Sequence, residues 1–409
     1  MATRKQHDAI DRRTEILDAA LRVVVRDGLD GIRSLVVAKE AGVSVALPHY
    51  YYPTLDDLVR AVWERFDDAE QARESTCFAD EGAPIDNLCS FVASAFAGSP
   101  DAVRERWMTR TEFQRRAMFD AGLADAVRAA EFRRLAAIEA AVAAAQAVGD
   151  VPSAADPRLI AARIVGAMDG FGVMLLVDLV SPAAASSGLD RMLETRSRWQ
   201  GPRERPLPAI GPMPAGADPD RRTVILDATI RLINREGVAG LHFPEVADEA
   251  AVSRSLPRYY YRTLADLLRA TFARDEEVTR ERVEWRASQI DDPLERLRDA
   301  YSHAIAADPD GMRPTWVLWF EYLRIAARDP SERRRANARL ASWVAYDSAI
   351  LRDLRREGRI AASVDIDDAE QRLLAVHNGA GALWMLGVLT PTRYAAVVDA
   401  TIDDELGLR

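Results

Sequence analysis

The chain has 409 residues, of which 48% are hydrophobic and 29% are charged, and its formal net charge at pH 7 is −10. This composition is typical of a soluble globular protein, and the length predicts two or three domains. The negative charge argues against diffuse affinity for nucleic acid but allows a local basic face. We expect no membrane contact, because the longest apolar run, Phe171 to Leu179, is short and contains Asp178.

The N-terminal residues contain no apolar segment like that of a signal peptide, so we expect a cytoplasmic protein. Cys77 and Cys89 lack metal or redox spacing and are expected to be reduced thiols. No pair of His and Glu residues has metal-ligand spacing on one helix, and no nucleophile elbow or phosphate-binding loop occurs. The sequence therefore predicts no metal site, no cofactor and no enzymatic activity.

The most informative feature is an internal repeat. Residues 12–66 recur as residues 221–275, so the offset is 209 positions, the difference between 12 and 221. RRTEILDAAL returns as RRTVILDATI, and VAKEAGVSVALPHYYYPTLDDLVRA returns as VADEAAVSRSLPRYYYRTLADLLRA. At the same offset Trp107 matches Trp316, and Glu112 matches Glu321. The whole chain therefore consists of two copies of one unit.

Strand signals are almost absent, and apolar residues recur at helical spacing, so we predict an all-α fold. One segment, GPRERPLPAIGPMPAGADPD, is too rich in Pro and Gly for a helix and is expected to be an extended linker between the halves. The predicted domains are 1–66 (DNA-binding), 67–200 (helical ligand-binding and dimerisation), 201–220 (linker), 221–275 (DNA-binding) and 276–409 (helical ligand-binding and dimerisation).

The first copy has the pattern of a helix-turn-helix unit. A helix from about Arg13 to Arg26 precedes a short helix from Ser34 to Glu40, a turn at Ala41-Gly42, and a second short helix that ends near Tyr50. We expect Ser44 to cap this second helix.

Thr54 and Asp57 have the spacing of a capping box at the start of the following helix. In the second copy Ser253 and Thr263 take the capping positions, and Ala251 replaces the turn glycine, so we expect a strained turn there.

These segments resemble a known family. EAGVSVALPHYYYPTLDDL resembles the DNA-binding signature of the TetR family of repressors, and EAAVSRSLPRYYYRTLADL is similar. WFEYLRIAARDPSERRR in the second half resembles the ligand-binding core of that family, and WMTRTEFQRRA in the first half is a weaker copy. Family members are normally homodimers with one unit per chain. The resemblance therefore implies a single-chain tandem regulator, a monomer whose halves form an intramolecular pseudo-dimer through the last two helices of each half.

The second short helix of each unit is expected to probe operator DNA. By the same resemblance, Tyr51 and Tyr260 reach phosphates, as do the helix amides that begin at Thr54 and Thr263. The exposed faces differ, with Val45 in one unit against Arg254 in the other, and Arg can read guanine whereas Val can only touch a thymine methyl. We therefore expect an asymmetric operator. The residues expected to contact double-stranded DNA are Arg33, Ser44, Val45, Ala46, His49, Tyr50, Tyr51, Thr54, His242, Ser253, Arg254, Ser255, Arg258, Tyr259, Tyr260 and Thr263. For the tyrosines alone, and for Arg254 alone, core packing and simple surface exposure remain the alternatives.

Aromatic residues in the helical domains suggest a binding pocket for a small lipophilic effector with one polar end. The expected ligand-binding residues are Trp316, Trp319, Phe320, Glu321, Trp343, Tyr346, His377 and Trp384 in the second half, and Trp107 and Phe113 in the less aromatic first half. Ordinary helix packing is the alternative for this stripe. The glycines at 170, 172, 379 and 381 fall inside helical patterns and are expected to allow close helix contact.

The sequence thus predicts a ligand-responsive transcriptional repressor that releases operator DNA when it binds its effector. One alternative is a ligand sensor or scaffold in which one or both DNA-binding units are degenerate, and the unequal probe faces keep it open. Another is an enzyme built on the helical domains, for which no catalytic set is recognisable.

Overall fold

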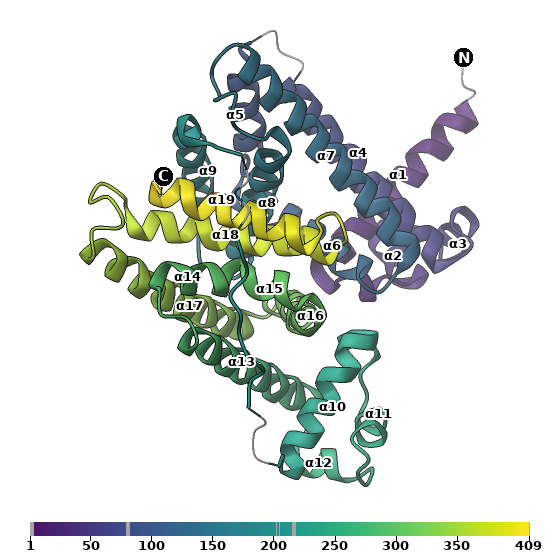
Figure 1. Cartoon of the computed structure of the whole chain (residues 1–409). Coiled ribbons are helices and arrows are strands. Elements are labelled where there is room, and N and C mark those ends of the chain that lie inside the picture. The colour runs from purple at the N-terminus through teal and green to yellow at the C-terminus, as the bar shows by residue number, and fades with distance from the viewer. Residues whose placement is uncertain (1–3, 79–81, 202, 204, 215–217, 409) are drawn as a thin grey trace.

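The computed structural model describes residues 4–78, 82–201, 203, 205–214 and 218–408, in which every regular element is a helix. The two halves have matching helices (Figure 1). The first half contains α1 (Arg4–Asp27), α2 (Ser34–Ala41), α3 (Ala46–Tyr51), α4 (Leu55–Phe78), α5 (Pro84–Ser94), α6 (Pro100–Ala117), α7 (Ala121–Ala147), α8 (Pro157–Leu176) and α9 (Pro182–Glu194). The second contains α10 (Arg221–Glu236), α11 (Phe243–Glu249), α12 (Leu256–Tyr260), α13 (Leu264–Ser288), α14 (Pro293–Arg298), α15 (Ala304–Ala307), α16 (Pro309–Ala326), α17 (Pro330–Arg356), α18 (Ile366–Met385) and α19 (Pro391–Leu406).

The core helices begin where the sequence places a capping side chain before a proline. Ser99, Asp156 and Ser181 each accept a hydrogen bond from a backbone N–H of the helix that follows, and Pro occupies its first turn. Proline is tolerated there because the first N–H groups of a helix have no intrahelical partner. The second half repeats this arrangement at α16 and α19, the counterparts of α6 and α9, so these helices begin at equivalent positions in both copies.

The helix-turn-helix pattern is present in both halves, with two corrections. Ser44 and Ser253 are not side-chain caps, because the probe helices begin later, after Val45 and Ser255, and neither helix has a side-chain cap. The first helix begins at Arg4 and not near Arg13.

The expected capping boxes are confirmed. Thr54 and Asp57 bond reciprocally, as do Thr263 and Asp266. The turn of the second unit is strained as expected, since Ala251 has a φ of 52° where Gly42 has 66° in the first unit.

The DNA-binding units and the helical cores are joined by shared helices. α4 runs through the boundary expected after residue 66, and α13 runs through that expected after residue 275. A shared helix makes a rigid mechanical link, because a displacement of its core end also displaces its other end.

The two halves meet where α8 crosses α18, in the middle of the molecule (Figure 1). A Cβ atom on Gly170 would overlap the carbonyl group of Ala375, and one on Gly379 would overlap that of Gly166. Gly166 and Ala375 are themselves equivalent positions of the repeat, so the crossing has pseudo-twofold symmetry. The glycines thus permit backbone contact between the halves, as the sequence predicts for them.

The other two glycines seat a tryptophan within each half. Cβ atoms on Gly172 and Gly381 would overlap the rings of Trp107 and Trp316, respectively. The sequence predicts close helix contact at these positions. Here the glycines contact a tryptophan side chain of α6 or α16.

α8 corrects one sequence expectation. By length and composition this 20-residue helix is apolar enough to cross a membrane, although no candidate was expected. Its most apolar window is wholly buried inside the protein, between α7, α9 and α18. The apolar composition therefore serves the contact between the halves.

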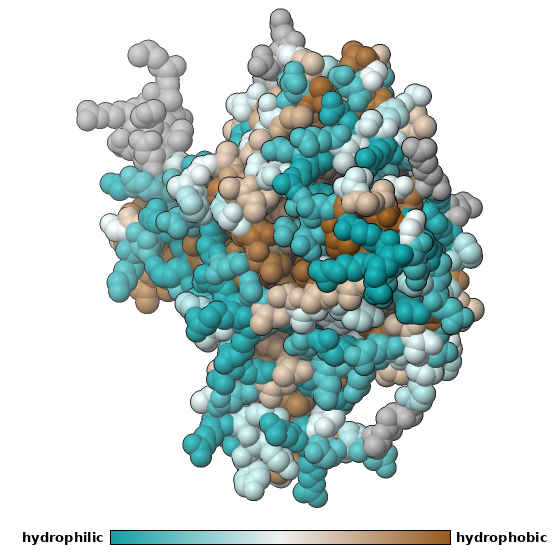
Figure 2. All heavy atoms as spheres, turned by 90° about the vertical axis from the view of Figure 1, so that its left-hand side faces the viewer, coloured by the Kyte–Doolittle hydropathy of each residue, from teal (hydrophilic) through white to brown (hydrophobic). Residues whose placement is uncertain are grey.

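Ion pairs between charged side chains flank this contact. Arg163 of α8 donates to Asp404 and Glu405 of α19 at 2.5 and 3.0 Å, and Arg372 donates to Glu405 at 2.7 Å. In the linker, whose described residues are not helical, Arg205 donates to Asp403 at 2.7 Å. Figure 2 shows one side of the molecule, where hydrophilic residues cover most of the lower lobe and apolar residues show mainly above it.

We predict that Gly379→Ala destabilises the protein by more than 1 kcal/mol, because an added methyl group forces apart two packed backbones (about 1–3 kcal/mol for overpacking). The free energy of unfolding in urea measures this effect. Gly122→Ala is the matched control, since the nearest atom to its Cβ would be the end of the Arg60 side chain at 3.3 Å. Alanine there should stabilise α7 slightly. Equal effects of the two substitutions would contradict the close crossing.

Candidate DNA-binding and ligand-binding sites

The probe helices α3 and α12, and the turn residues just before them, present the predicted DNA-contacting side chains to solvent. Ser44, Val45, Ala46, His49 and Tyr50 are exposed, as are Ser253, Arg254, Ser255, Arg258, Tyr259 and Tyr260. Only the prolines of these helices, Pro48 and Pro257, are buried. The sequence-predicted residues therefore lie together on one exposed face in each unit.

The tyrosine triplets divide between surface and core. Tyr50 and Tyr259 are 77% and 79% exposed, whereas Tyr261 is buried. Tyr51 is half-buried, and the guanidinium of Arg13 lies 5.0 Å from the centre of its ring. A half-buried tyrosine beside a cation can still reach a phosphate backbone through its hydroxyl group.

The two probe faces differ in charge. Arg254 is 78% exposed and makes one long ion pair with Asp248, at 3.6 Å. Arg258 lies 5.1 Å from the centre of the Phe243 ring of α11, which holds its guanidinium against the neighbouring helix. Arg254 is thus the freer of the two cations.

The flanking residues of the expected DNA contact are also exposed. Thr54 and Thr263 begin α4 and α13, and Arg33 and His242 precede α2 and α11. Arg33 donates to the carbonyl oxygens of Asp30 and Ile32 at 2.8 and 2.7 Å, so its guanidinium is bound to its own turn.

Two buried carboxylates attach the DNA-binding units to the cores. Glu112 of α6 accepts the backbone N–H of Leu29 at 3.0 Å, and Glu321 of α16 accepts that of Val238 at 3.1 Å. Arg115 joins them, donating to Glu112 at 2.9 Å and to Glu321 at 2.6 Å. Burial alone would raise the pKa of Glu112, but Arg115 and neighbouring arginines outweigh burial and lower it. Both carboxylates therefore connect the two halves to each other.

The end of α16 also contacts the DNA-binding unit of the other half. Arg324 pairs with Asp30 at 3.3 Å, and Arg328 donates to the carbonyl oxygens of Val24 and Val25 at the end of α1. The first half has no equivalent of this contact at the repeat position of Arg328, because Phe119 stands there. α16 is thus connected to both DNA-binding units.

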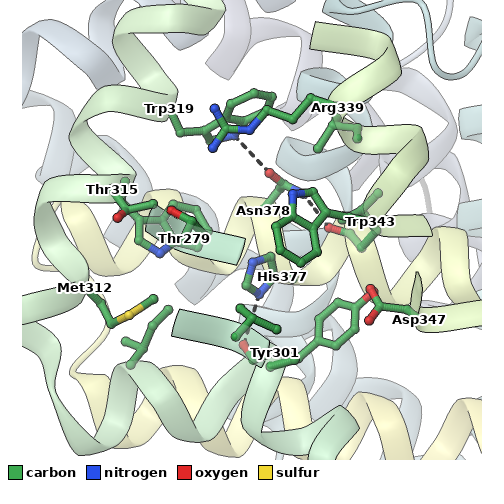
Figure 3. A pocket seen from close by; sticks show the side chains of 16 residues that line it. Thr279, Tyr301, Met312, Thr315, Trp319, Arg339, Trp343, Asp347, His377 and Asn378 are labelled. Carbon is green, nitrogen blue, oxygen red and sulfur yellow. Dashed lines mark hydrogen bonds between the residues drawn. The ribbon is translucent and has the colours of Figure 1, made fainter. Parts of the chain in front are cut away.

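The second half contains a cavity of about 150 Å³ between α13, α16, α17 and α18 (Figure 3). Four of the residues predicted to bind ligand line it, namely Trp316, Trp319, Trp343 and His377, and its wall is mostly apolar. A small, mostly apolar cavity with few polar groups suits a small organic molecule.

The structure places the other predicted residues elsewhere. Glu321 does not line the cavity, because it accepts hydrogen bonds from Val238 and Arg115, where the core meets the DNA-binding unit. Phe320 and Trp384 lie behind Trp316, with ring centres 6.3 and 6.1 Å from it. Tyr346 lines a smaller adjoining cavity. These four residues therefore lie outside the lining of the main cavity, and a role for them in ligand binding remains a prediction.

In the first half the two predicted residues serve the core. Phe113 is fully buried against Trp63, with ring centres 5.1 Å apart, inside the first DNA-binding unit. Trp107 stacks on Phe96 at 5.3 Å and touches only a very small cavity. Neither residue lines a space that could hold an organic ligand.

Buried titratable groups surround one end of the second-half cavity. Burial raises the pKa of Asp347 to about 7, although a hydrogen bond from Tyr301 lowers it. Burial also raises the pKa of Glu370 to about 8, assisted by the charge of Asp347. The hydroxyl of Tyr301 lies 3.4 Å from Oε1 of Glu370. Burial lowers the pKa of His377 to about 4, so this imidazole is neutral at pH 7.

Tyr301, Arg339 and Asp347 line the cavity but were missed in the sequence. Asp347 follows Trp343 by four residues, which places both on one face of α17, and this spacing could have identified it. Tyr301 lies in a π-helical turn (Asp299–His303), which a regular helical period does not reveal.

In the first half, charged side chains fill the equivalent place. Trp319, Trp343 and Asn378 correspond to Arg110, Arg134 and Asp169. Arg134 pairs with Asp169 at 2.6 Å, and Arg110 pairs with Glu131 at 2.7 Å. These buried ion pairs leave a cavity of only about 10 Å³. At this equivalent place the second half has an open cavity of about 150 Å³ and the first half does not.

Comparison with protein families agrees with the repeat. The family model for the C-terminal domain of BetI-type transcriptional repressors, a TetR C-terminal domain, matches residues 84–197 and 293–407. Together these ranges cover more than half of the chain. They contain the core helices from α5 to α9 and from α14 to α19.

Individual relatives match over shorter lengths. The HTH-type transcriptional regulator PksA of Bacillus subtilis is 26% identical over 121 residues, 29% of this chain. HdnoR of Paenarthrobacter nicotinovorans, a nicotine-responsive repressor, is 38% identical over 52 residues, 13% of this chain. The chain spans 59% and 27% of the lengths of these two relatives.

Two solved structures match one half of the chain. A TetR-family regulator from Rhodococcus sp. is 25% identical, with 46% of this chain and 98% of that chain covered and a TM-score of 0.41. A transcriptional regulator from Saccharomonospora viridis, solved with choline, is 22% identical, with 45% and 95% covered and a TM-score of 0.42. On the strength of the double match to the family model, this chain belongs to the TetR family of transcriptional regulators and carries two TetR-type units in tandem.

Proposed function

We propose that the chain is a ligand-responsive transcriptional repressor that works as a monomer. It binds an asymmetric operator through α3 and α12 and releases the DNA when a small lipophilic molecule enters the cavity of the second half. One observation supports this most directly. Trp316 and Trp319 on α16 line the cavity, and Glu321, Arg324 and Arg328 on and just after the same helix contact both DNA-binding units.

The proposed coupling follows from rigid connections. A ligand that pushes α16 also moves Glu321, which holds the backbone of Val238, and Arg328, which holds the end of α1. Buried ion pairs tolerate little displacement, because a separated buried charge is costly. One bound molecule can therefore shift both units relative to each other and change the spacing of the probe helices, which has to match about one turn of DNA.

The direct test is an electrophoretic titration of the chain with DNA from upstream of its own coding sequence. Specific binding by a monomer that falls steeply with salt supports the proposal, because phosphate contacts release counterions. Competitor DNA of unrelated sequence should not displace the protein at equal concentration. If the chain fails to bind any such DNA, it is a sensor or scaffold with degenerate units.

We predict that Arg254→Ala relaxes base preference in one half-site only. Arg254, in the turn just before α12, has a 78% exposed side chain, and a bidentate contact with guanine contributes about 1–3 kcal/mol of discrimination. The measurement is binding to operators with each base pair changed in turn. Val45→Ala is the control at the equivalent position and should have little effect. A strictly palindromic best site, selected from random DNA, would contradict the asymmetric operator.

We also predict that Trp316→Ala and Trp107→Ala differ in ligand response but not greatly in stability. Both rings are buried against a glycine of their own half, so both variants should lose about 3–5 kcal/mol of packing energy. Only Trp316 lines the cavity. DNA release by small molecules found in a screen should therefore weaken at least tenfold in Trp316→Ala alone. The opposite result would move the effector site to the first half.

A further inference from the structure

We propose that the second DNA-binding unit anchors the chain on DNA, with Arg258 and Arg262 as phosphate contacts that the first unit lacks. The first unit then adds base selection at a half-site that it cannot hold alone. This inference rests on the proposed function, which assigns both units to DNA, and names the unit that carries the electrostatic part of binding.

The two units differ in charge over the segment that forms the turn, the probe helix and the start of the next helix. In the second unit residues 251–266 contain three arginines, Arg254, Arg258 and Arg262, and one carboxylate, Asp266. In the first unit the equivalent residues 42–57 contain two carboxylates, Asp56 and Asp57, and neither Lys nor Arg. Contacts between cations and phosphates supply the part of DNA affinity that does not depend on sequence. The second unit therefore gains far more of this affinity from its probe segment.

Arg258 and Arg262 are exposed, and their charges are not neutralised by the protein. Among the described residues neither guanidinium makes an ion pair or a hydrogen bond, and Arg258 only rests against the Phe243 ring, 5.1 Å from its centre. Arg262 stands in the turn between α12 and α13, between Tyr260 and Thr263. Both neighbours are expected to contact phosphates, so Arg262 adds a cation to an existing row of phosphate-binding groups.

The helices before the turn differ in the opposite sense. α11 carries two exposed or half-exposed carboxylates, Glu245 and Asp248, where α2 has an apolar residue and Lys39. Asp248 lies 3.6 Å from Arg254 and so offsets the charge of that arginine in part. The other two arginines of the probe segment keep their full charge. Lys39 is therefore the cation of the first unit that competes with them.

The remaining cations near the probe helices do not alter the balance. Arg33 of the first unit donates to the carbonyl oxygens of its own turn at 2.8 and 2.7 Å. The Arg-Arg pair at residues 12–13 recurs at residues 221–222, so it contributes equally to both units.

The first unit exposes apolar side chains where the second exposes charge. Val45 and Leu55 are 53% and 43% exposed, and the place of Arg262 is taken by Pro53. Such a face can contact thymine methyl groups but cannot neutralise phosphates. Its binding therefore depends on a matched base sequence and on the second unit, which holds it close to the DNA and so raises its effective concentration there.

The first experiment measures how binding of the full chain depends on salt. The probe is a labelled duplex of mixed sequence, followed by fluorescence anisotropy between about 50 and about 200 mM salt. Arg258→Ala and Arg262→Ala should each reduce the slope of log K against log salt by about 0.9, the loss of one phosphate contact. Pro53→Arg should increase it by a similar amount, because it gives the first unit the missing cation.

Two controls accompany these variants. Arg352→Ala removes an exposed arginine from α17, whose side chain is 58% exposed, and should leave the slope unchanged. Lys39→Ala should reduce the slope less than either arginine variant does. An unchanged slope in both arginine variants, or a fall with Lys39→Ala as large as theirs, would overturn the inference. All these side chains are exposed, and unchanged thermal unfolding of each variant checks that it folds.

The second experiment uses the operator, located by footprinting upstream of the coding sequence, with one half-site at a time replaced by unrelated sequence. DNA that keeps only the half-site of the second unit should bind at least tenfold more tightly than mixed-sequence DNA. DNA that keeps only the other half-site should bind no more tightly than mixed-sequence DNA. Equal affinity for the two half-operators would overturn the inference.

Failure of this inference and failure of the proposed function give different results. If the arginine variants change the salt slope on mixed-sequence DNA but no operator is found, the repressor function is wrong and the anchor stands. If the chain binds an operator and both half-sites hold it equally, the anchor is wrong and the repressor function stands.

Discussion

The structure depends on the place where α8 crosses α18 without side chains between the backbones. Gly170 and Gly379 allow this approach, and a methyl group at either position would overlap the partner helix. Around this crossing the two copies share one hydrophobic core. The halves also meet where α6 contacts α16, beside the DNA-binding units.

Where α6 meets α16, charge takes the place of apolar packing. Arg115 binds Glu112 and Glu321 at once, and each carboxylate also holds a backbone N–H of its own DNA-binding unit. Removing Arg115 would leave the two buried carboxylates only their longer ion pairs with Arg328 and Arg324, at 3.3 and 3.8 Å, and weakening a buried ion pair is costly. The positions of both units thus depend on one network. Arg328 adds a contact from the second core to the first DNA-binding unit, and the first core has no equivalent contact. The two units therefore depend unequally on the two cores.

The two copies differ in chemical character where a ligand would sit. At three equivalent positions the second half has Trp319, Trp343 and Asn378 around an open cavity, whereas the first half has Arg110, Arg134 and Asp169 in ion pairs. The opposite charges of these pairs neutralise each other, and their side chains fill the space that a ligand would need. A tandem chain can tolerate this loss, because one copy can keep the binding site while the other supports the fold. In a homodimer both copies would change together.

The sequence by itself determined the repeat, the all-helical class, the two helix-turn-helix units, the turn strain at Ala251 and the glycine contacts. These depend on local spacing and on residue types with few conformational options. It also identified four residues of the cavity wall. Only the tertiary structure decided that Glu321 belongs to the junction, that Phe113 belongs to a core, and that Ser44 and Ser253 do not cap their helices. It alone brought Asp347, Tyr301 and Glu370 together, because they come from three helical segments whose distance in space no local pattern encodes.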